Sequence, residues 1–360
     1  MNRRLLVGAM TCFAIASVGG ILAQAPPAQP APGGRGAGKG GGKGGGRAGN
    51  PATPEDLADI AKLAQLPVLV NGAGDGDFSI GPDYTPAPEE KQRVGIPHGK
   101  LVEFFMSSAS SKVFPGDTPF ERLVSVYIPA QYVAGRPAPF IFSADSYGVR
   151  DRQMANILDN MIADRRLPVM VAVMVANGPG QERSLEYDTV SPVFADFVES
   201  EILPRVEKET GVTLTKDPEG RMTYGGSSGG AMALTMAWFR NDRYHRVLSY
   251  SGTFVDLREG PEAPHAAYEY PEHFFPDNPV KPIRIWMHVS ENDIGAASAS
   301  ADRRNWVIAN QRLAGVLKAK GYHYQFVYAK NAGHVDAKVI HQTLPQALEY
   351  VWKDYPISGK

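Results

Sequence analysis

A short run of glycines and serines, Gly225–Gly230, stands between two segments of contrasting pattern. The apolar segment RMTYG before it favours a strand, and the segment AMALTMAW after it favours a helix. The run contains the pattern G-x-S-x-G twice, centred on Ser227 and on Ser228. In such a turn the serine occupies a strained backbone position, and its small neighbours let the strand and the helix approach closely. The hydroxyl is then presented at the start of a helix, where free N–H groups can stabilise a developing oxyanion.

Two other interpretations of the glycine run are a purely structural turn and a phosphate-binding loop. No lysine follows the glycines as it does in a P-loop. The favoured hypothesis is therefore nucleophilic chemistry at one of the two serines. Spacing alone does not choose between them.

A serine nucleophile needs a base, and in this kind of strand–turn–helix arrangement an acid and then a histidine follow the serine along the chain. Seven histidines follow the glycine run. His334 comes directly after the turn-like loop Lys330–Gly333, at the carboxyl end of an expected strand, and it is the predicted base. His288 and His323 fall inside or at the start of expected strands, so structural roles are predicted for them. The alternative for His334 is a histidine in an ordinary surface loop.

The acid that orients the base should end the preceding strand. The apolar segment 283–290 runs directly into Glu291-Asn292-Asp293. Asp293 is the predicted acid, whose task is to hold the imidazole tautomer and to stabilise the imidazolium. Glu291 and Asp336 remain alternatives, and Asp293 could also be a solvated turn carboxylate.

Two backbone N–H groups should bind the oxyanion. One belongs to the residue after the nucleophile, which is Ser228 if Ser227 attacks. The other should come from the loop after an early central strand. The segment PFIFSAD ends at Asp145, so the N–H of Ser146 is the candidate. An ordinary turn at this position is the alternative.

The elements that must position these groups alternate between strand and helix patterns. Such alternation predicts βαβ units around a mostly parallel sheet with helices on both faces, and ligands bind at the carboxyl ends of its strands. The turn-rich segment 70–90 is expected to wrap the surface. Strands are predicted at 101–108, 122–130, 139–145, 167–176, 221–225, 246–252, 283–290 and 324–330, and helices at 54–64, 151–166, 193–210, 231–240, 305–321 and 344–355.

The first 54 residues differ from the rest. Two arginines precede an apolar run that ends in small residues, which is the layout of a secretory signal peptide over residues 1–23, with a membrane anchor as the alternative. Residues 24–54 are rich in Pro, Ala and then Gly, with scattered basic residues, and are expected to form a disordered linker or a weak basic tether. Residues 55–360 are expected to form a single α/β domain.

Charge and cysteine content exclude several classes of function. The formal net charge is −1, and the first 50 residues carry six basic and no acidic side chains, which leaves −7 on residues 51–360. So acidic a body argues against nucleic acid as a partner. Cys12 is the only cysteine, so a disulfide scaffold and a thiolate zinc site are excluded.

The motifs together resemble the enterochelin-esterase-like branch of the α/β-hydrolases, to which feruloyl esterases and mycolyltransferases are more distantly related. RSLEYD, LPRVEK, SSGG, the GTF after VLSYS, SEND, NWxxAN and GH occur in that order, and the resemblance covers about residues 70–356. It implies Ser227 as the nucleophile, Asp293 as the acid and His334 as the base. The family usually has Asp-Gly where this chain has Asp145-Ser146, which puts the second oxyanion donor in question.

The resemblance also implies that Arg183, Glu186 and Tyr187 line the cleft beside these groups. A structural salt bridge between Arg183 and Glu186 is the alternative. Trp306 could rim the same pocket, although core and cap roles for it are equally open.

The expected function is a secreted or periplasmic serine esterase that works through an acyl-enzyme, with no metal and no organic cofactor. The family implies an acyl ester of a sugar, a polysaccharide or a siderophore-like small molecule as substrate. No nucleic-acid partner and no membrane span after signal cleavage are expected. An acyltransferase with the same three residues, a peptidase or lactonase, and a catalytically inactive carbohydrate-binding relative are the alternatives.

Overall fold

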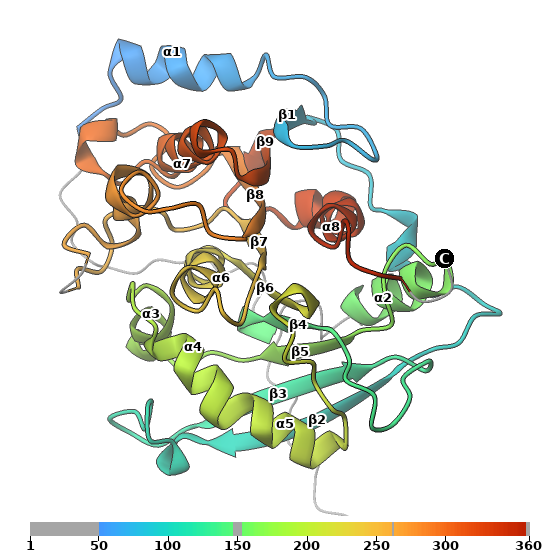
Figure 1. Cartoon of the computed structure of the whole chain (residues 1–360). Helices are drawn as coiled ribbons and strands as arrows, with labels where there is room; N and C mark the ends of the chain where they lie inside the picture. Colours follow the sequence, from blue (N-terminus) through green and yellow to red (C-terminus); the bar gives the residue numbers. More distant parts are fainter. Residues whose placement is uncertain (1–49, 147–152, 261–262, 358–360) are drawn as a thin grey trace, which may run out of the picture. The chain divides into compact units, whose positions relative to one another are not determined.

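One nine-stranded sheet organises the described part of the chain, which comprises residues 50–146, 153–260 and 263–357 of a computed structural model (Figure 1). The strand order is β1-β9-β8-β7-β6-β4-β5-β3-β2; β2 and β3 are antiparallel to their neighbours, and all other pairs are parallel. The prediction of a mostly parallel sheet is confirmed. The strands are β1 (Gly76–Ile80), β2 (Lys100–Ser107), β3 (Glu121–Ile128), β4 (Phe140–Ser143), β5 (Val171–Val175), β6 (Arg221–Gly226), β7 (Arg246–Tyr250), β8 (Arg284–Asn292) and β9 (His323–Gly333).

Helices cover both faces of the sheet. One core cluster joins the sheet to α3–α7, and a second joins its other face to α2 and α8; Figure 1 shows the two groups on opposite sides of the strands. The helices are α1 (Pro54–Leu63), α2 (Gln153–Ala163), α3 (Gln181–Tyr187), α4 (Val193–Phe197), α5 (Leu203–Thr210), α6 (Ser228–Phe239), α7 (Trp306–Lys320) and α8 (Ala337–Val351), with a π-helical turn (Val198–Ile202) between α4 and α5.

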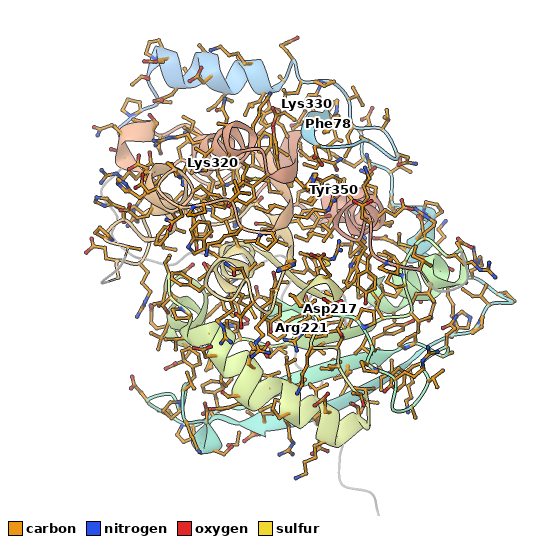
Figure 2. The ribbon with its side chains drawn as sticks, in the orientation of Figure 1. Phe78, Asp217, Arg221, Lys320, Lys330 and Tyr350 are labelled. Atoms are coloured by element: carbon orange, nitrogen blue, oxygen red, sulfur yellow. The ribbon has the colours of Figure 1, made fainter. Side chains whose placement is uncertain are left out.

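The carboxyl ends of the central strands β6, β7 and β8 all lie at one edge of the sheet because these strands are parallel. Ser227 follows β6 directly, and Asp293 follows β8. Asp217 and Arg221, which Figure 2 labels, mark the opposite, amino end of β6. The topology therefore gathers the predicted catalytic groups at a single edge.

The sequence-based boundaries were wrong at three places. The turn-rich segment 70–90 contains β1, a short edge strand that pairs with β9; Figure 2 labels Phe78 on β1 close to Lys330 on β9. Helix α3 was not predicted. Helix α8 begins at Ala337 rather than 344, with Pro345 inside it. A proline inside a helix leaves the carbonyl four residues earlier without its helical donor, and the carbonyl of His341 accepts the N–H of Ala87 instead, at 2.8 Å.

The predicted signal peptide and residues 24–49 of the predicted linker lie outside the described residues. Residues 50–54, also assigned to the linker, are instead fixed to the folded domain. Asn50 makes two hydrogen bonds to the carboxylate of Asp302, and Pro51 forms a β-bridge with Ser298. The folded domain thus begins at about residue 50, because these backbone groups find partners in the loop before α7.

Thr53 is the N-cap of α1. Its hydroxyl accepts the N–H of Asp56 at 3.1 Å, and the Asp56 carboxylate accepts the N–H of Thr53 at 2.9 Å, which is a capping box. Asp56 also accepts the N–H of Ser300 at 3.2 Å, so it connects α1 to the loop before α7. Hydrogen bonds from Ser300 and Thr53 lower the pKa of Asp56 to about 2, although burial opposes this.

This lowered pKa makes the stability of the domain depend on pH through Asp56. The stabilisation is complete above the ordinary Asp pKa of about 4 and is lost as the pH falls through about 2. We expect Asp56→Asn to lower the free energy of unfolding by about 2 kcal/mol at pH 7, and the difference from the unmodified protein to shrink below about pH 4. Urea denaturation at a series of pH values measures it. The control is Asp59→Asn, which removes an exposed ion pair to Lys62 and should have little effect. A pH-independent difference for Asp56→Asn would contradict this assignment.

Candidate active site

The turn between β6 and α6 has the geometry expected of a nucleophile elbow. Ser227 has φ 58° and ψ −128°, in a region that residues other than glycine rarely adopt. A Cβ at position 225 would lie 2.3 Å from the carbonyl oxygen of Gly229. Glycine at 225 is therefore required for β6 and α6 to approach this closely. Ser228 is the first residue of α6, so its N–H has no acceptor within the helix.

His334 lies between the two other predicted catalytic residues. Its Nε2 is 2.8 Å from Ser227 Oγ, and its Nδ1 is 2.6 Å from Asp293 Oδ1. With the proton of the neutral ring on Nδ1, His334 donates to Asp293 and accepts from Ser227. The His334 side chain is 24% exposed, whereas the Asp293 side chain is fully buried. The base is thus reachable from solvent and the acid is not.

Several donors surround the Asp293 carboxylate. Oδ2 accepts the Ser251 hydroxyl at 2.7 Å and the Ser290 N–H at 3.2 Å, and Oδ1 accepts the Ile294 N–H at 2.8 Å. Burial raises the pKa of Asp293, but hydrogen bonds from His334, Ser251 and Ile294 outweigh burial and leave the pKa below its ordinary value. Asp293 is therefore an ionised carboxylate at neutral pH.

The two alternative acids have other contacts. Glu291 accepts the N–H of Asn331 at 2.6 Å, and Asp336 caps α8 by accepting the N–H of Lys338 at 2.9 Å. Glu291 lies at a break in the β8–β9 register, between Ser290 and Asn292. Both carboxylates hold the backbone around the loop that carries His334, and Asp293 is the carboxylate at His334 Nδ1.

The loop after β4, which carries the predicted second oxyanion donor, lies beside the elbow. Asp145 has φ 55° within a 3-10 turn, Ala144–Ser146, and this turn is the last described segment before residue 153. A Cβ at Gly229 would lie 3.0 Å from Ala144 Cβ and 3.2 Å from Asp145 Oδ2. The turn therefore lies against the first residues of α6. Ser146 is the last residue of this turn, and its role as second donor stays a prediction.

Arg183 reaches this same turn. It binds Asp145 through two hydrogen bonds, of 2.9 and 2.8 Å, and its guanidinium lies over the ring of Tyr187. The pair with Asp145 places Arg183 beside the start of α6. The alternative of a salt bridge between Arg183 and Glu186 is wrong, since Asp145 is the carboxylate that Arg183 binds.

Glu186 and Tyr187 do not line an open cleft, which corrects the expectation for both. Each is 1% exposed. Glu186 forms a buried ion pair with Arg122 and accepts the N–H of Gly178. The ring of Tyr187 packs edge-on against Phe194, and its hydroxyl lies 3.5 Å from the N–H of Asp145. Both side chains point from α3 into the core. From there the Tyr187 hydroxyl contacts the turn that contains Asp145.

Trp306 lies against His334. The two rings meet edge to face, with centroids 6.2 Å apart, and the backbone N–H of Trp306 donates to the carbonyl of Ile294. Trp306 is 6% exposed, so it forms a wall behind the base. Trp306 thus lies beside the proposed site, next to His334. Any contact of Trp306 with substrate stays a prediction.

Three residues that contact the predicted catalytic groups were missed by the motif analysis. Ser251 binds Asp293, Thr253 Oγ1 lies 3.4 Å from Ser227 Oγ, and the buried Asp188 lies beside the Ser228 side chain. Burial raises the pKa of Asp188. Ser251 and Thr253 follow β7, so the rule that ligands bind at the carboxyl ends of strands could have found them.

His288 has the structural role that was predicted from its position within a strand. It is completely buried in β8, stacked on Trp286, and its Nε2 lies 3.2 Å from Ser290 Oγ. Burial lowers the pKa of His288 to about 4, so it is neutral at neutral pH. Within the described ranges, no cluster of three or more His, Cys, Asp or Glu side chains could hold a metal ion, and no helix is both long and apolar enough to cross a membrane.

Comparison with known proteins places the chain in a family. A family model described as "Putative esterase" matches residues 117–350. The chain belongs to this esterase family. A search of curated protein sequences found no match for this chain.

Solved structures show the same fold. The enterobactin esterase of Shigella flexneri, in the presence of 2,3-di-hydroxy-N-benzoyl-serine, has a TM-score of 0.53 and 20% identity, over 72% of this chain and 60% of that chain. A ferulic acid esterase of the anaerobic fungus Anaeromyces mucronatus has a TM-score of 0.54 and 14% identity, over 75% and 96%. The chain thus spans about 60% of the length of the bacterial structure. The predicted α/β-hydrolase fold and the resemblance to the enterochelin-esterase-like branch are confirmed.

Proposed function

We propose that this protein hydrolyses carboxylic esters through an acyl-enzyme formed on Ser227. The observation that carries the proposal is the continuous hydrogen-bond chain from Ser227 Oγ through His334 to Asp293, with contacts of 2.8 and 2.6 Å. Contacts of this length are those required between a nucleophile and its base, and between the base and the group that orients it. Membership of the esterase family supports the same reaction class.

In the first half of the reaction, His334 Nε2 takes the proton of Ser227 as Oγ attacks the ester carbonyl carbon. The carbonyl oxygen becomes an oxyanion that the Ser228 N–H, and the proposed second donor Ser146, would bind. The imidazolium returns the proton to the leaving alcohol, and the acyl group stays on Ser227. Water then repeats these steps with His334 as its base and releases the acid.

The fixed elements of the site reduce the reorganisation that each step needs. Ser227 is already held in its strained conformation by the elbow, and the Asp293 carboxylate stays ionised among its donors. A buried ionised carboxylate at Nδ1 stabilises the imidazolium that forms at each transition state. The site therefore supplies the base, the orientation and the electrostatic stabilisation from its own side chains.

For the substrate we propose an acyl ester of a sugar, a polysaccharide or a siderophore-like aromatic molecule. The related folds support this class, since one belongs to an enterobactin esterase and another to a ferulic acid esterase. A panel of acetyl, butyryl, feruloyl and para-nitrophenyl esters tests the proposal. Products should be the free acid and alcohol; transfer of the acyl group to an added sugar in preference to water would instead identify an acyltransferase. We also propose export to the periplasm or beyond, from the pattern of residues 1–23.

The rate of hydrolysis should depend on pH through the base. Because an imidazole must be neutral to accept the serine proton, kcat/KM on an uncharged ester should fall along a single limb as the pH drops into the acid range. His334→Ala should remove nearly all activity. His323→Ala should leave the limb in place, because His323 lies at the start of β9 and pairs with Asp75. A flat profile down to pH 4, or activity that chelation abolishes, would contradict this mechanism.

A further inference from the structure

The turn that follows β7, Ser251–Thr253, contacts Asp293, Ser227 and the residue that follows His334. Ser251 binds Asp293, and its Oγ also accepts the N–H of Val335, the residue after His334, at 3.1 Å. Thr253 donates its N–H to the carbonyl of Ser227 at 3.1 Å. One short segment thus joins the acid loop, the base loop and the elbow.

The position of Ser251 within this turn is closely defined. It has φ 46°, a strained value for a residue other than glycine, and it is completely buried. Its N–H donates to the carbonyl of His288 at 2.8 Å, and the next carbonyl, that of Gly252, accepts from the Asn310 side chain at 2.9 Å. These bonds fix the backbone of the turn in the position from which the Ser251 hydroxyl reaches the Asp293 carboxylate.

We propose that Ser251 is a positioning residue: its hydroxyl holds Asp293 Oδ2, so that Oδ1 faces His334, and it ties the acid loop to the base loop. The inference rests on the proposed function. Ser251, in the turn after β7, would be a fourth residue of the site beside the three proposed to act in the reaction.

The hydroxyl has two separable effects. As a donor it draws charge toward Oδ2, so its removal leaves more negative charge for the imidazolium at Oδ1 and favours the protonated base. As an acceptor it restrains Val335, so its removal loosens the loop that presents His334. The first effect moves the acid limb of kcat/KM to higher pH, and the second lowers kcat.

Other ionisable groups near Asp293 and His334 should not move the limb. His288 faces them from β8 and is neutral at neutral pH, and Asp336 lies at the start of α8 with its carboxylate on backbone N–H groups. Neither touches Ser251 Oγ in the described structure, so both stay constant when that hydroxyl is removed.

The experiment compares Ser251→Ala, Ser251→Gly and the control Ser249→Ala. Ser249 is on the same strand and is equally buried, but its hydroxyl has no hydrogen-bond partner in the described structure. Glycine adopts φ 46° without strain, so Ser251→Gly removes the hydroxyl without threatening the backbone. We expect both Ser251 variants to lose about 10- to 100-fold in kcat/KM, mainly in kcat, and to shift the acid limb upward by roughly 0.5 pH unit. Ser249→Ala should match the unmodified protein.

If the acid limb of kcat/KM lies at the same pH in Ser251→Gly as in the unmodified protein, the inference is overturned, whether or not the rate falls. A merely structural role would lower the rate without changing the pH at which the limb occurs. Ser251→Gly decides the matter if Ser251→Ala fails to fold. Failure of the proposed function is distinguishable, since the unmodified protein would then hydrolyse no ester or would keep its activity after Ser227→Ala.

Discussion

Ser227→Ala should reduce ester hydrolysis to background, a loss on the order of 10⁵- to 10⁶-fold in kcat. The hydroxyl at this position is the one 2.8 Å from His334 Nε2. The fold should be unaffected, because alanine keeps the Cβ and the backbone bonds of the elbow. Steady-state kinetics on a para-nitrophenyl ester measures the loss of hydrolysis, and a melting curve checks the fold.

Ser228→Ala is the matched control, one residue along the same turn. Its hydroxyl lies beside the buried Asp188, and its proposed contribution to the reaction is a backbone N–H. We expect this variant to keep its rate within about tenfold and to melt at a lower temperature, because a buried carboxylate loses a polar neighbour. If Ser228→Ala were inactive and Ser227→Ala active, the other frame of the G-x-S-x-G pattern would be the functional one.

Asp293→Asn should lower kcat by about four orders of magnitude while the protein stays folded. An amide group facing Nδ1 favours the tautomer with the proton on Nε2, and that ring cannot accept the proton of Ser227. Glu291→Gln is the control, since Glu291 accepts only from the Asn331 backbone in the described structure. This substitution should have only a mild effect on kcat. Near-normal turnover in Asp293→Asn would move the acid to another loop.

The parts of the site that are local in sequence were predictable. The elbow is a dense motif whose geometry follows from its glycines, since a Cβ at 225 would collide with Gly229. His334 and Asp293 each follow a strongly apolar strand, so parallel pairing of β8 and β9 brings them to the same edge as Ser227. Their mutual contacts then follow from topology.

The parts that depend on distant partners were not predictable. Arg183 lies three residues before Glu186, yet each binds a residue elsewhere in the chain, Asp145 and Arg122 respectively. Spacing along one helix carries no information about such partners. Ser251 was missed for a similar reason, because a lone serine after a strand has no distinctive pattern until the fold shows what it touches.

β1 was missed and α8 was predicted to begin too late because local signals opposed the tertiary structure. β1 is rich in Gly and Asp, residues that are unfavourable in strands, and is stabilised by pairing with β9 at the sheet edge. Pro345 suggested the start of a helix, whereas α8 continues through it because Ala87 supplies a donor to the carbonyl that the proline leaves free.

The most direct test of the account is covalent labelling with a fluorophosphonate, which reacts with an activated serine and needs no knowledge of the natural ester. The folded protein should gain one adduct, peptide mapping should place it on Ser227, and Asp293→Asn should label far more slowly. No adduct on the folded protein, or an adduct on any other serine, would contradict a nucleophile at Ser227.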